Sequence, residues 1–276
     1  MLSGPSDDSA IIVANDLRRY FRIRIDGDGV LDSVKRFFWP TYRTVKALDG
    51  ISFEIRRGEA VGYIGLNGAG KSTTIKLMCG VLVPTSGYVR VAGMEPHRCR
   101  MAIARRIGLM MGQRSQLLWD LPVRESFYLL GRIYDLRPAD YRASVDRLLD
   151  ILDIGSLWDV PVRGLSLGQK TRCDLALTFL HQPDVVFLDE PTIGLDVIAR
   201  ERIRDFLRSE KERGTTIFLA SHDLGDLEIV ADRVMLVHRG RLLFDGTLSE
   251  LFQAIGGNPA TLEEAVKRFY KEASLG

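Results

Sequence analysis

The chain has 276 residues, which is enough to bury a full core and fits one large domain or two small ones. Its 38 basic and 36 acidic residues leave a net charge of +2, and this balance argues against nucleic acid as the main partner, because nucleic-acid binders usually concentrate basic charge. No apolar run in the sequence approaches the roughly 20 residues that a membrane-spanning helix needs.

The first ten residues are polar and acidic, which predicts a flexible tail at 1–10 rather than a secretory signal. The three cysteines, Cys79, Cys99 and Cys173, lie far apart and lack the spacing of metal ligands. We expect them to be buried free thiols in a reducing cytosol.

Short β-rich runs alternate with helical segments along most of the chain. Strands are predicted at residues 11–16, 51–55, 59–66, 88–93, 106–112, 184–190, 215–221 and 233–246, with helices between the later strands at 167–181 and 198–212. Because strands that alternate with helices usually form a sheet with helices packed on it, the pattern predicts an α/β fold with a largely parallel sheet.

Two segments stand apart from this alternation. From Val123 to Leu152 the apolar residues recur only at helical spacing, which predicts a helical subdomain inserted into the α/β core, at about 114–170. At the other end, residues 247–276 form a predicted C-terminal extension that closes with the amphipathic helix "TLEEAVKRFYKEA".

The segment "GLNGAGKS", residues 65–72, matches the pattern G-x-x-x-x-G-K-[ST] of a phosphate-binding loop. Its glycines let backbone N–H groups turn toward an anion, and the helix that follows adds the positive end of its dipole. A glycine-rich turn with an exposed lysine is the alternative, but the apolar strand before the loop and the helix after it favour phosphate binding. The predicted nucleotide-binding residues are Gly65, Leu66, Asn67, Gly68, Ala69, Gly70, Lys71, Ser72 and Thr73.

A pair of acidic residues completes this chemistry. In "DVVFLDEPT" four apolar residues run into Asp189 and Glu190, as expected of a buried strand that ends at the carboxyl edge of the sheet, where open α/β sheets bind ligands. Asp189 would hold Mg²⁺, and Glu190 would orient and deprotonate an attacking water. Two acids in a turn are usually only solvated; at the end of an apolar strand, in a chain with a phosphate loop, they indicate catalysis.

Two further motifs give the sequence a specific resemblance. The segment "LSLGQ", residues 165–169, opens a predicted helix shortly before the acidic strand end, and "IGLD" ends at Asp196. They resemble the signature motif and the D-loop of ATP-binding cassette (ABC) ATPases. The usual signature has glycine where this chain has Leu167, but the serine and second glycine that contact the γ-phosphate in the family are present as Ser166 and Gly168, followed by Gln169.

Three single residues match the same family in its order, and the resemblance covers roughly residues 11–246. Tyr20 lies at the position of the aromatic that stacks on adenine, with Phe21 as a competitor. Gln113 lies at the position of the Q-loop glutamine and is preferred to its rival Gln116, because it directly follows a predicted strand. His222, after another apolar strand, is similar to the family's switch histidine.

The resemblance implies the ABC ATPase fold, which has a phosphate-loop NTPase core with a mostly parallel sheet, an antiparallel β subdomain and an inserted helical subdomain. It implies ATP and Mg²⁺ as cofactors and a head-to-tail dimer, of identical or related subunits, in which the signature of one subunit closes over the phosphate loop of the other. By the same resemblance the metal would be held by Ser72, Gln113 and Asp189, and the catalytic residues would be Lys71, Gln113, Glu190 and His222.

An insertion at about 22–46 separates the adenine-stacking region from the core. In residues 33–48, basic and aromatic side chains are interleaved. This pattern suits a membrane–water interface or a membrane-protein partner. A packed hairpin with solvated charges fits the pattern equally well. Similar insertions occur in the ABC subunits of polysaccharide and drug exporters, and residues 113–127 also resemble exporter subunits. We therefore expect an exporter ATPase at the cytoplasmic face of the cell membrane, with a separate permease and no nucleic acid as partner. The alternative is a soluble ABC ATPase with a mechanochemical or regulatory role.

Overall fold

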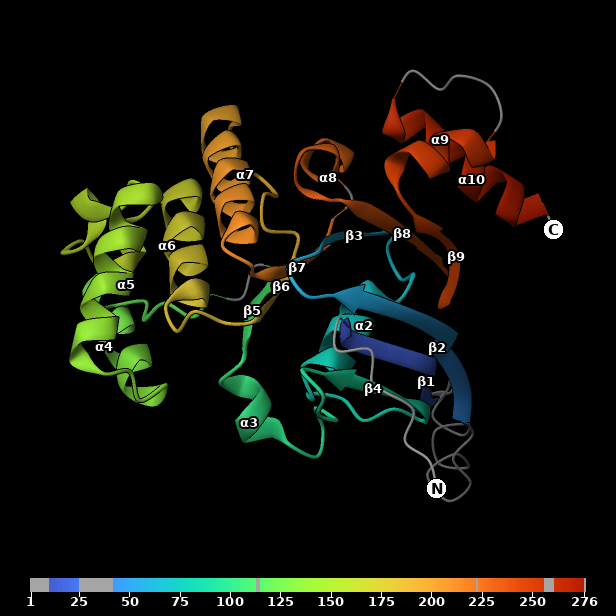
Figure 1. Cartoon of the computed structure of the whole chain (residues 1–276), viewed down its shortest axis with the longest axis horizontal. Helices are drawn as coiled ribbons and strands as arrows, with labels where there is room; N and C mark the ends of the chain where they lie inside the picture. Colours follow the sequence, from blue (N-terminus) through green and yellow to red (C-terminus); the bar gives the residue numbers. More distant parts are fainter. Residues whose placement is uncertain (1–9, 25–41, 113–114, 222, 256–260, 276) are drawn as a thin grey trace, which may run out of the picture.

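A six-stranded sheet forms the centre of the molecule (Figure 1). The computed structural model describes residues 10–24, 42–112, 115–221, 223–255 and 261–275. Neighbouring strands run in the order β5-β6-β7-β3-β8-β9, and every pair is parallel except β8 and β9, which confirms the predicted α/β fold. The strands are β3 (Ala60–Gly65), β5 (Ile107–Met111), β6 (Val185–Asp189), β7 (Thr216–Ala220), β8 (Arg233–His238) and β9 (Arg241–Gly246).

The strand sequences explain the place of the sheet. β3, β6 and β7 are buried along their whole length, as expected of strands that are covered on both faces. Successive residues point to opposite faces, so that Val61 and Tyr63 belong to one core while Ala60 and Ile64 belong to the other.

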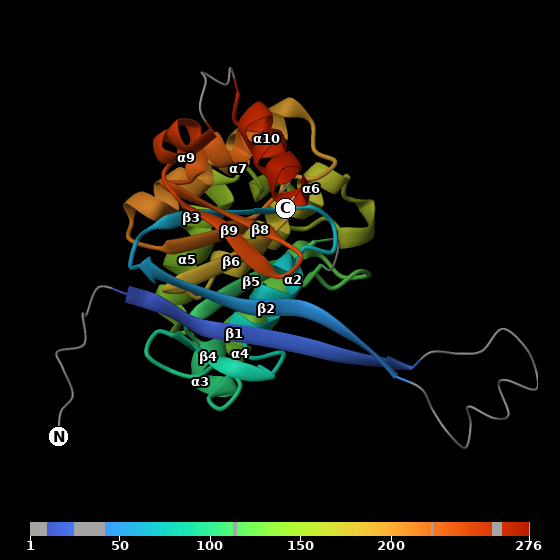
Figure 2. The same ribbon diagram turned by 90° about the vertical axis from the view of Figure 1, so that its right-hand side faces the viewer.

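A second, antiparallel sheet has the order β2-β1-β4, and it corresponds to the antiparallel β subdomain that the resemblance implies. Its strands are β1 (Ala10–Arg24), β2 (Tyr42–Arg56) and β4 (Ser86–Val91). β1 and β2 pair from Ala10 and Arg56 to Arg24 and Tyr42, and Figure 2 shows their far ends extending beyond the body of the molecule. The ends of the expected insertion, 22–24 and 42–46, are therefore strand residues, whereas residues 25–41 lie outside the described chain.

Helices cover both faces of the central sheet. α2 (Lys71–Met78) packs with the antiparallel sheet in one core, to which Ile103 of α3 (Arg100–Ala104) also belongs. The other core contains buried residues of α6 (Leu167–Phe179), α7 (Val197–Glu212) and α8 (Leu224–Val230). Because both faces of the sheet are covered, side chains on both sides of the central strands are buried, and the strands are therefore apolar along their length.

The expected helical subdomain lies at one end of the molecule, beside α6 (Figure 1). It contains α4 (Val123–Ile133) and α5 (Pro138–Ile151), followed by 3₁₀ turns at Gly155–Leu157 and Val162–Gly164. Pro138 occupies the first turn of α5, where its missing N–H is not needed. At Gly131 a Cβ atom would lie 2.6 Å from the ring of Tyr141, so glycine allows the two helices to pack closely.

The C-terminal range 247–276 contains α9 (Leu248–Ile255) and α10 (Leu262–Leu275), beside β8 and β9 (Figure 1). None of the described helices has the length and apolar character that crossing a membrane requires. All three cysteines are free; Cys173 is buried as expected, but Cys99 is exposed, so the expectation of a buried thiol was wrong there, because Cys99 directly precedes the short surface helix α3.

Candidate active site

The predicted phosphate loop connects the end of β3 to the start of α2. Its glycines are required by close approaches: a Cβ atom on Gly65 would lie 2.7 Å from the side chain of Val237, and one on Gly70 would lie 2.7 Å from the carbonyl oxygen of Ala47. Gly68 and Gly70 also have positive φ angles of 81° and 113°, which side chains disfavour. The sequence therefore folds here into a turn of bare backbone that leads into the N-terminus of a helix.

A cavity of about 330 Å³ opens beside this loop. The structure brings the loop residues and the acidic strand end together around it: Leu66, Asn67, Gly68, Gly70, Lys71, Ser72, Thr73, Asp189 and Glu190. Gly65 is the last residue of β3, and Ala69 is buried behind the loop. Segments that are more than a hundred residues apart in the sequence thus form one site.

Lys71 is the buried cation of this site. Its Nζ donates to the carbonyl oxygen of Gly65 at 2.6 Å and lies 3.9 Å from Oε1 of Glu190. Only 8% of Lys71 is exposed. A positive charge with so little water around it is well placed to compensate phosphate charge.

Ser72 and Asp189 meet in the same cavity, where the Ser72 hydroxyl donates to Oδ2 of Asp189 at 2.7 Å. A hydroxyl and a carboxylate are oxygen donors of the kind that Mg²⁺ prefers, and Mg²⁺ usually takes only one or two protein ligands when phosphates supply the rest. The described residues contain no cluster of three or more His, Cys, Asp or Glu side chains that could hold a metal alone. The pair therefore fits a metal ion that is shared with a nucleotide.

Glu190 follows Asp189 with an unusual backbone. Its φ angle is 57°, and its N–H donates to the carbonyl oxygen of Ala220 at the end of β7. Left-handed geometry in a residue other than glycine costs about 1–3 kcal/mol, so the surrounding contacts must hold Glu190 in this conformation. Here the turn keeps the carboxylate at the edge of the sheet, near Lys71, rather than letting the chain continue as a strand.

The signature residues do not line this cavity. Ser166 is the N-cap of α6: its Oγ accepts from the N–H of Gln169 at 3.3 Å, and the Gln169 side chain accepts from the N–H of Ser166 at 2.9 Å. This reciprocal capping box explains why α6 begins at Leu167. Ser166 is exposed and Gly168 half-buried, so the positive end of α6 faces solvent.

Asp196 caps α7 in the same way, by accepting from the N–H of Ala199 at 2.8 Å. Leu167, the departure from the usual signature, packs on this segment, since a Cβ atom on Gly194 would lie 3.0 Å from one of its methyl groups. Apolar side chains are exposed around the two helix starts: Leu167, Ile193, Val197 and Ile198.

Tyr20 also lies outside the cavity lining, but it is firmly held. Its hydroxyl donates to Asp49 at 2.7 Å, and Lys46 lies over its ring at 5.4 Å. The hydrogen bond from Tyr20, together with the guanidinium of Arg241, lowers the pKa of Asp49 to about 2. The competitor Phe21 lies instead beneath the guanidinium of Arg19, at 4.6 Å.

Two predicted residues, Gln113 and His222, lie outside the described chain. The rival Gln116 is engaged elsewhere, because its amide donates to the carbonyl oxygen of Leu109 and to the hydroxyl of Thr178. These contacts hold its side chain against β5 and α6 rather than in the phosphate cavity.

Sequence reasoning missed four residues that line the cavity: Val45, Lys46, Ala47 and Gly112. Residues 45–47 were expected in the insertion or at its end, but in the structure they belong to β2 and lie beside the phosphate loop. No local sequence signal reveals them, because their place depends on the pairing of β2 with β1, in which Lys46 lies opposite Tyr20.

Comparisons with known proteins agree with this geometry. The family described as ABC transporter matches residues 48–193. The daunorubicin resistance ATP-binding protein DrrA3 of Streptomyces coeruleorubidus is 38% identical over 217 residues, which cover 79% of this chain and 68% of that protein. The probable multidrug ABC transporter ATP-binding protein YbhF of Escherichia coli is 37% identical over 205 residues, 74% of this chain and 35% of that protein.

A solved structure described as the ATP binding subunit of an ABC transporter superposes with a TM-score of 0.78 at 26% identity, covering 94% of this chain and 99% of its own. The family match, the two relatives and the joined phosphate loop and acidic strand end lead to one conclusion. The chain belongs to the ABC transporter family and is an ATPase subunit.

Proposed function

We propose that this ATPase powers the export of a substrate through a separate membrane permease, to which it binds at the cytoplasmic face. The main support for ATP hydrolysis is that one cavity is lined by Lys71, Ser72, Asp189 and Glu190. The names of the relatives support export, since one is a daunorubicin resistance protein and another a probable multidrug transporter protein. The carboxylate of Glu190 beside the phosphate loop favours hydrolysis over a regulator that only binds ATP, because it can act as a general base.

The chain's own groups explain how ATP would be held. The glycine loop and the N-terminus of α2 would bind the phosphates through backbone N–H groups, and Lys71 would balance their charge. Ser72, Asp189 and Gln113 would hold Mg²⁺, which when bound neutralises phosphate charge. Lys71 would have to exchange its bond to Gly65 for the nucleotide, while remaining close to Glu190.

Hydrolysis would depend on Glu190 as the base that orients a water molecule and removes its proton. His222 and Gln113 would complete the surroundings of the γ-phosphate, and Tyr20 would stack on adenine. Lys71 lies 3.9 Å from Oε1 of Glu190, so the cation that would balance the phosphate charge also lies next to the proposed base.

A second ATPase subunit would supply the signature. Ser166 and the N-terminus of α6 face solvent in one subunit, and the exposed apolar side chains of Leu167, Ile193 and Val197 surround them. Val197 is 80% exposed and its neighbour Ile198 is 69% exposed, so the start of α7 presents apolar side chains to solvent. Covering this surface with the phosphate loop of a second subunit would bury apolar area and bring donors to the γ-phosphate.

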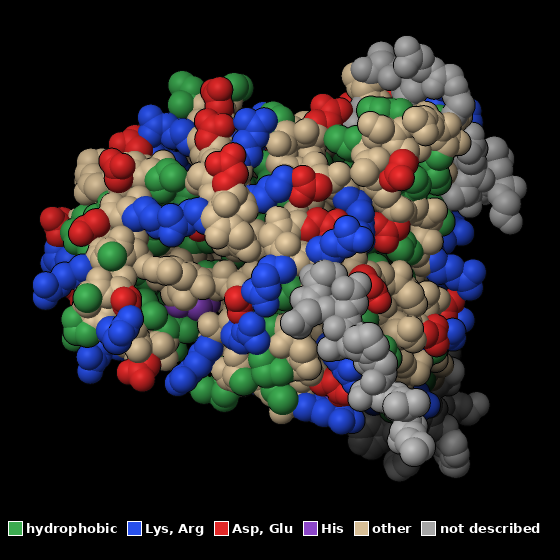
Figure 3. All heavy atoms as spheres, viewed as in Figure 1, with side chains coloured by type: hydrophobic (Ala, Val, Ile, Leu, Met, Phe, Trp, Pro, Cys, Tyr) green, Lys and Arg blue, Asp and Glu red, His purple; other side chains and the backbone are tan. Residues whose placement is uncertain are grey.

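A groove of about 420 Å³ supports the permease as partner. It lies between α3, β5 and the helical subdomain, and Figure 3 shows the surface hollowed there. Val81, Leu109 and Tyr134 belong to its lining, and apolar side chains near it, such as Met101 and Ile133, are exposed. The groove also contains Gln116, so a permease bound there would contact the segment that follows Gln113 in the sequence.

The test compares two variants with matched controls. Glu190→Gln should lower ATP turnover about a hundredfold or more and leave ATP affinity nearly unchanged, because it removes the base but not the phosphate cradle. Lys71→Ala should weaken ATP binding itself by about ten- to a hundredfold, the size expected for a lost charged hydrogen bond. Glu201→Gln, the same change at an exposed position of α7, should alter neither quantity.

Turnover is measured by phosphate release and affinity by equilibrium titration. In membranes that contain the permease, Glu190→Gln should stop efflux while the subunit stays in the membrane fraction. Near-normal turnover of Glu190→Gln would assign the base to another residue, and loss of turnover without any effect on efflux would contradict the export role.

A further inference from the structure

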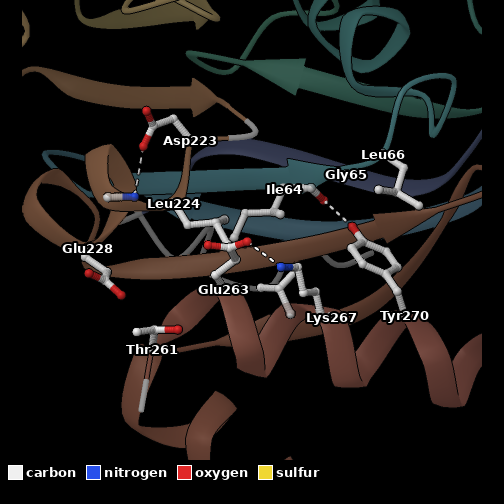
Figure 4. Close-up of a pocket in the computed structure, with 12 residues that line it drawn as sticks. Ile64, Gly65, Leu66, Asp223, Leu224, Glu228, Thr261, Glu263, Lys267 and Tyr270 are labelled. Carbon is white, nitrogen blue, oxygen red and sulfur yellow. Dashed lines mark hydrogen bonds and ion pairs between the residues drawn. The ribbon is translucent and has the colours of Figure 1, made fainter. Parts of the chain in front are cut away.

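The C-terminal helix α10 lies behind the phosphate loop and contacts the strand that leads into it (Figure 4). Tyr270 of α10 points toward the end of β3, and its hydroxyl lies 3.2 Å from the carbonyl oxygen of Ile64 and 3.1 Å from that of Val237. Tyr270 is only 8% exposed. Burial raises the pKa of its phenol, so the hydroxyl keeps its proton and remains a donor at neutral pH.

The two carbonyl groups belong to neighbouring strands at the point where the loop begins. Gly65, the first residue of the loop, is paired with Val237 of β8 and directly follows Ile64. The strands are so close that a Cβ atom on Gly65 would lie 2.7 Å from the Val237 side chain. The single hydrogen of the Tyr270 hydroxyl is shared between these two carbonyl oxygens, so Tyr270 links both strands at the point where the loop begins.

The next contact leads to the catalytic lysine. The carbonyl oxygen of Gly65 accepts the 2.6 Å hydrogen bond from Nζ of Lys71. Tyr270, Ile64, Gly65 and Lys71 thus form an unbroken series in which each member is bonded to the next. A shift of Ile64 would move the group that holds the lysine.

A cavity of about 580 Å³ lies between α10 and the nucleotide site. One wall is formed by Ile64, Gly65 and Leu66, and another by Asp223 and Leu224, which come directly after the position of the switch histidine. Asp223 is in turn paired with Arg200 of α7 at 2.5 Å. α10 therefore faces two segments of the nucleotide site, 64–66 and 223–225, across this cavity. The Tyr270 hydroxyl contacts the central sheet directly.

The helix itself is well attached. Ala265 and Val266 are buried, and the ring of Phe269 packs on that of Phe244 at 5.6 Å. Glu263 and Lys267, one turn apart, form an ion pair at 2.5 Å on the side of the helix that lines the cavity (Figure 4). These contacts hold α10 in place without the Tyr270 hydroxyl, so removing the hydroxyl should leave the helix docked.

We propose that Tyr270 is a positioning residue for the phosphate loop, through which the docking of α10 sets the affinity for ATP. The inference rests on the proposed binding of ATP at Lys71 and adds a role for the C-terminal extension. According to this proposal, α10 influences the affinity for ATP although it lies outside the nucleotide site.

The experiment uses the full chain and the change Tyr270→Phe, which removes the hydroxyl and keeps the ring. The dissociation constant for ATP should rise about three- to tenfold, the effect of one hydrogen bond, with the Michaelis constant rising alike and kcat staying within about twofold of wild type. Tyr141→Phe, the same change on a half-buried tyrosine of α5, should leave all three constants unchanged.

Tyr270→Ala separates positioning from packing. It should weaken ATP binding little more than Tyr270→Phe does, but it should lower the melting temperature further, because it also removes the buried ring. Wild-type ATP affinity in Tyr270→Phe, or a loss of kcat without a loss of affinity, would overturn the proposal. If the wild-type protein itself bound no ATP, the proposed function would fail instead, so the two failures are distinguishable.

Discussion

Tyr20 is an aromatic side chain whose orientation is set by charge. Its hydroxyl is bonded to Asp49, and Asp49 also accepts from Arg241 at 3.0 Å and from Lys46 at 3.4 Å. With a pKa of about 2, Asp49 stays ionised at neutral pH. The ring is thus fixed before any nucleotide arrives, which lowers the entropy that stacking would cost.

If Tyr20 stacks on the base, Tyr20→Ala should raise the Michaelis constant about tenfold for ATP and GTP alike, since every base has a face to stack on. Tyr20→Trp should raise the Michaelis constant only slightly, because it keeps an aromatic ring. Tyr20→Phe should also have a small effect on the constant, because it keeps the ring and loses only the hydrogen bond to Asp49. Steady-state kinetics with both nucleotides provide the measurement. An unchanged constant in Tyr20→Ala with a raised one in Phe21→Ala would transfer the role to Phe21.

Among the elements, those with a local pattern were predictable from the sequence. β3, β6 and β7 are continuous apolar runs, and the phosphate loop and the acidic pair Asp189–Glu190 are contiguous motifs at strand ends. The long reach of β1 and β2 was not, because every side chain at their outer ends, 22–24 and 42–44, is exposed, so no buried face indicates a strand there. Lys46 was missed for the same reason: its place in the cavity depends on strand register, which no local motif encodes.

The junction between α6 and β5 contains a histidine that responds to pH. His181 donates from Nε2 to the carbonyl oxygen of Ile107 at 3.0 Å, and its ring stacks on Tyr134 with the planes 4° apart. Burial lowers its pKa to about 4, below the value of about 6.5 expected in the unfolded chain. The folded protein therefore binds this proton less readily than the unfolded protein.

The stability that comes from neutral His181 should be complete above about pH 6.5 and should be lost as the pH falls from there to about 4. The loss can reach about 3 kcal/mol, from the difference between the two pKa values. Urea unfolding of wild type and His181→Phe over this range provides the measurement. The variant should have the flatter pH dependence, and parallel curves for the two proteins would contradict the pKa assignment.

At the scale of the whole molecule, each proposed ATP site takes Lys71 from one subunit and Ser166 from the other. A single subunit separates the two, since Ser166 does not line the cavity that contains Lys71. Hydrolysis would then depend on assembly, and reopening of the dimer after hydrolysis would move the attached permease.

Mixed dimers test this division. A Lys71→Ala homodimer and a Ser166→Arg homodimer should both be inactive, but their heterodimer places both defects in one site and leaves the other intact. Its ATPase rate should return to at most about half the wild-type rate, since one of two sites works. A heterodimer of wild type with the double variant has one defect in each site and should stay inactive. The heterodimers are isolated with two different affinity tags, and equal rates for them would contradict a shared site.

The capping box at the start of α6 leaves the hydroxyl hydrogen of Ser166 uncommitted. A serine hydroxyl has one hydrogen and two lone pairs, and here the oxygen accepts from the N–H of Gln169, which uses a lone pair but not the hydrogen. The hydrogen is therefore free to point outward, toward the place where the phosphate of a second subunit would lie. An aspartate at this position would cap the helix equally well, but it would have no hydrogen to offer and would repel an anion. Helix capping and phosphate binding are thus separable properties of one oxygen atom, and only a hydroxyl has both.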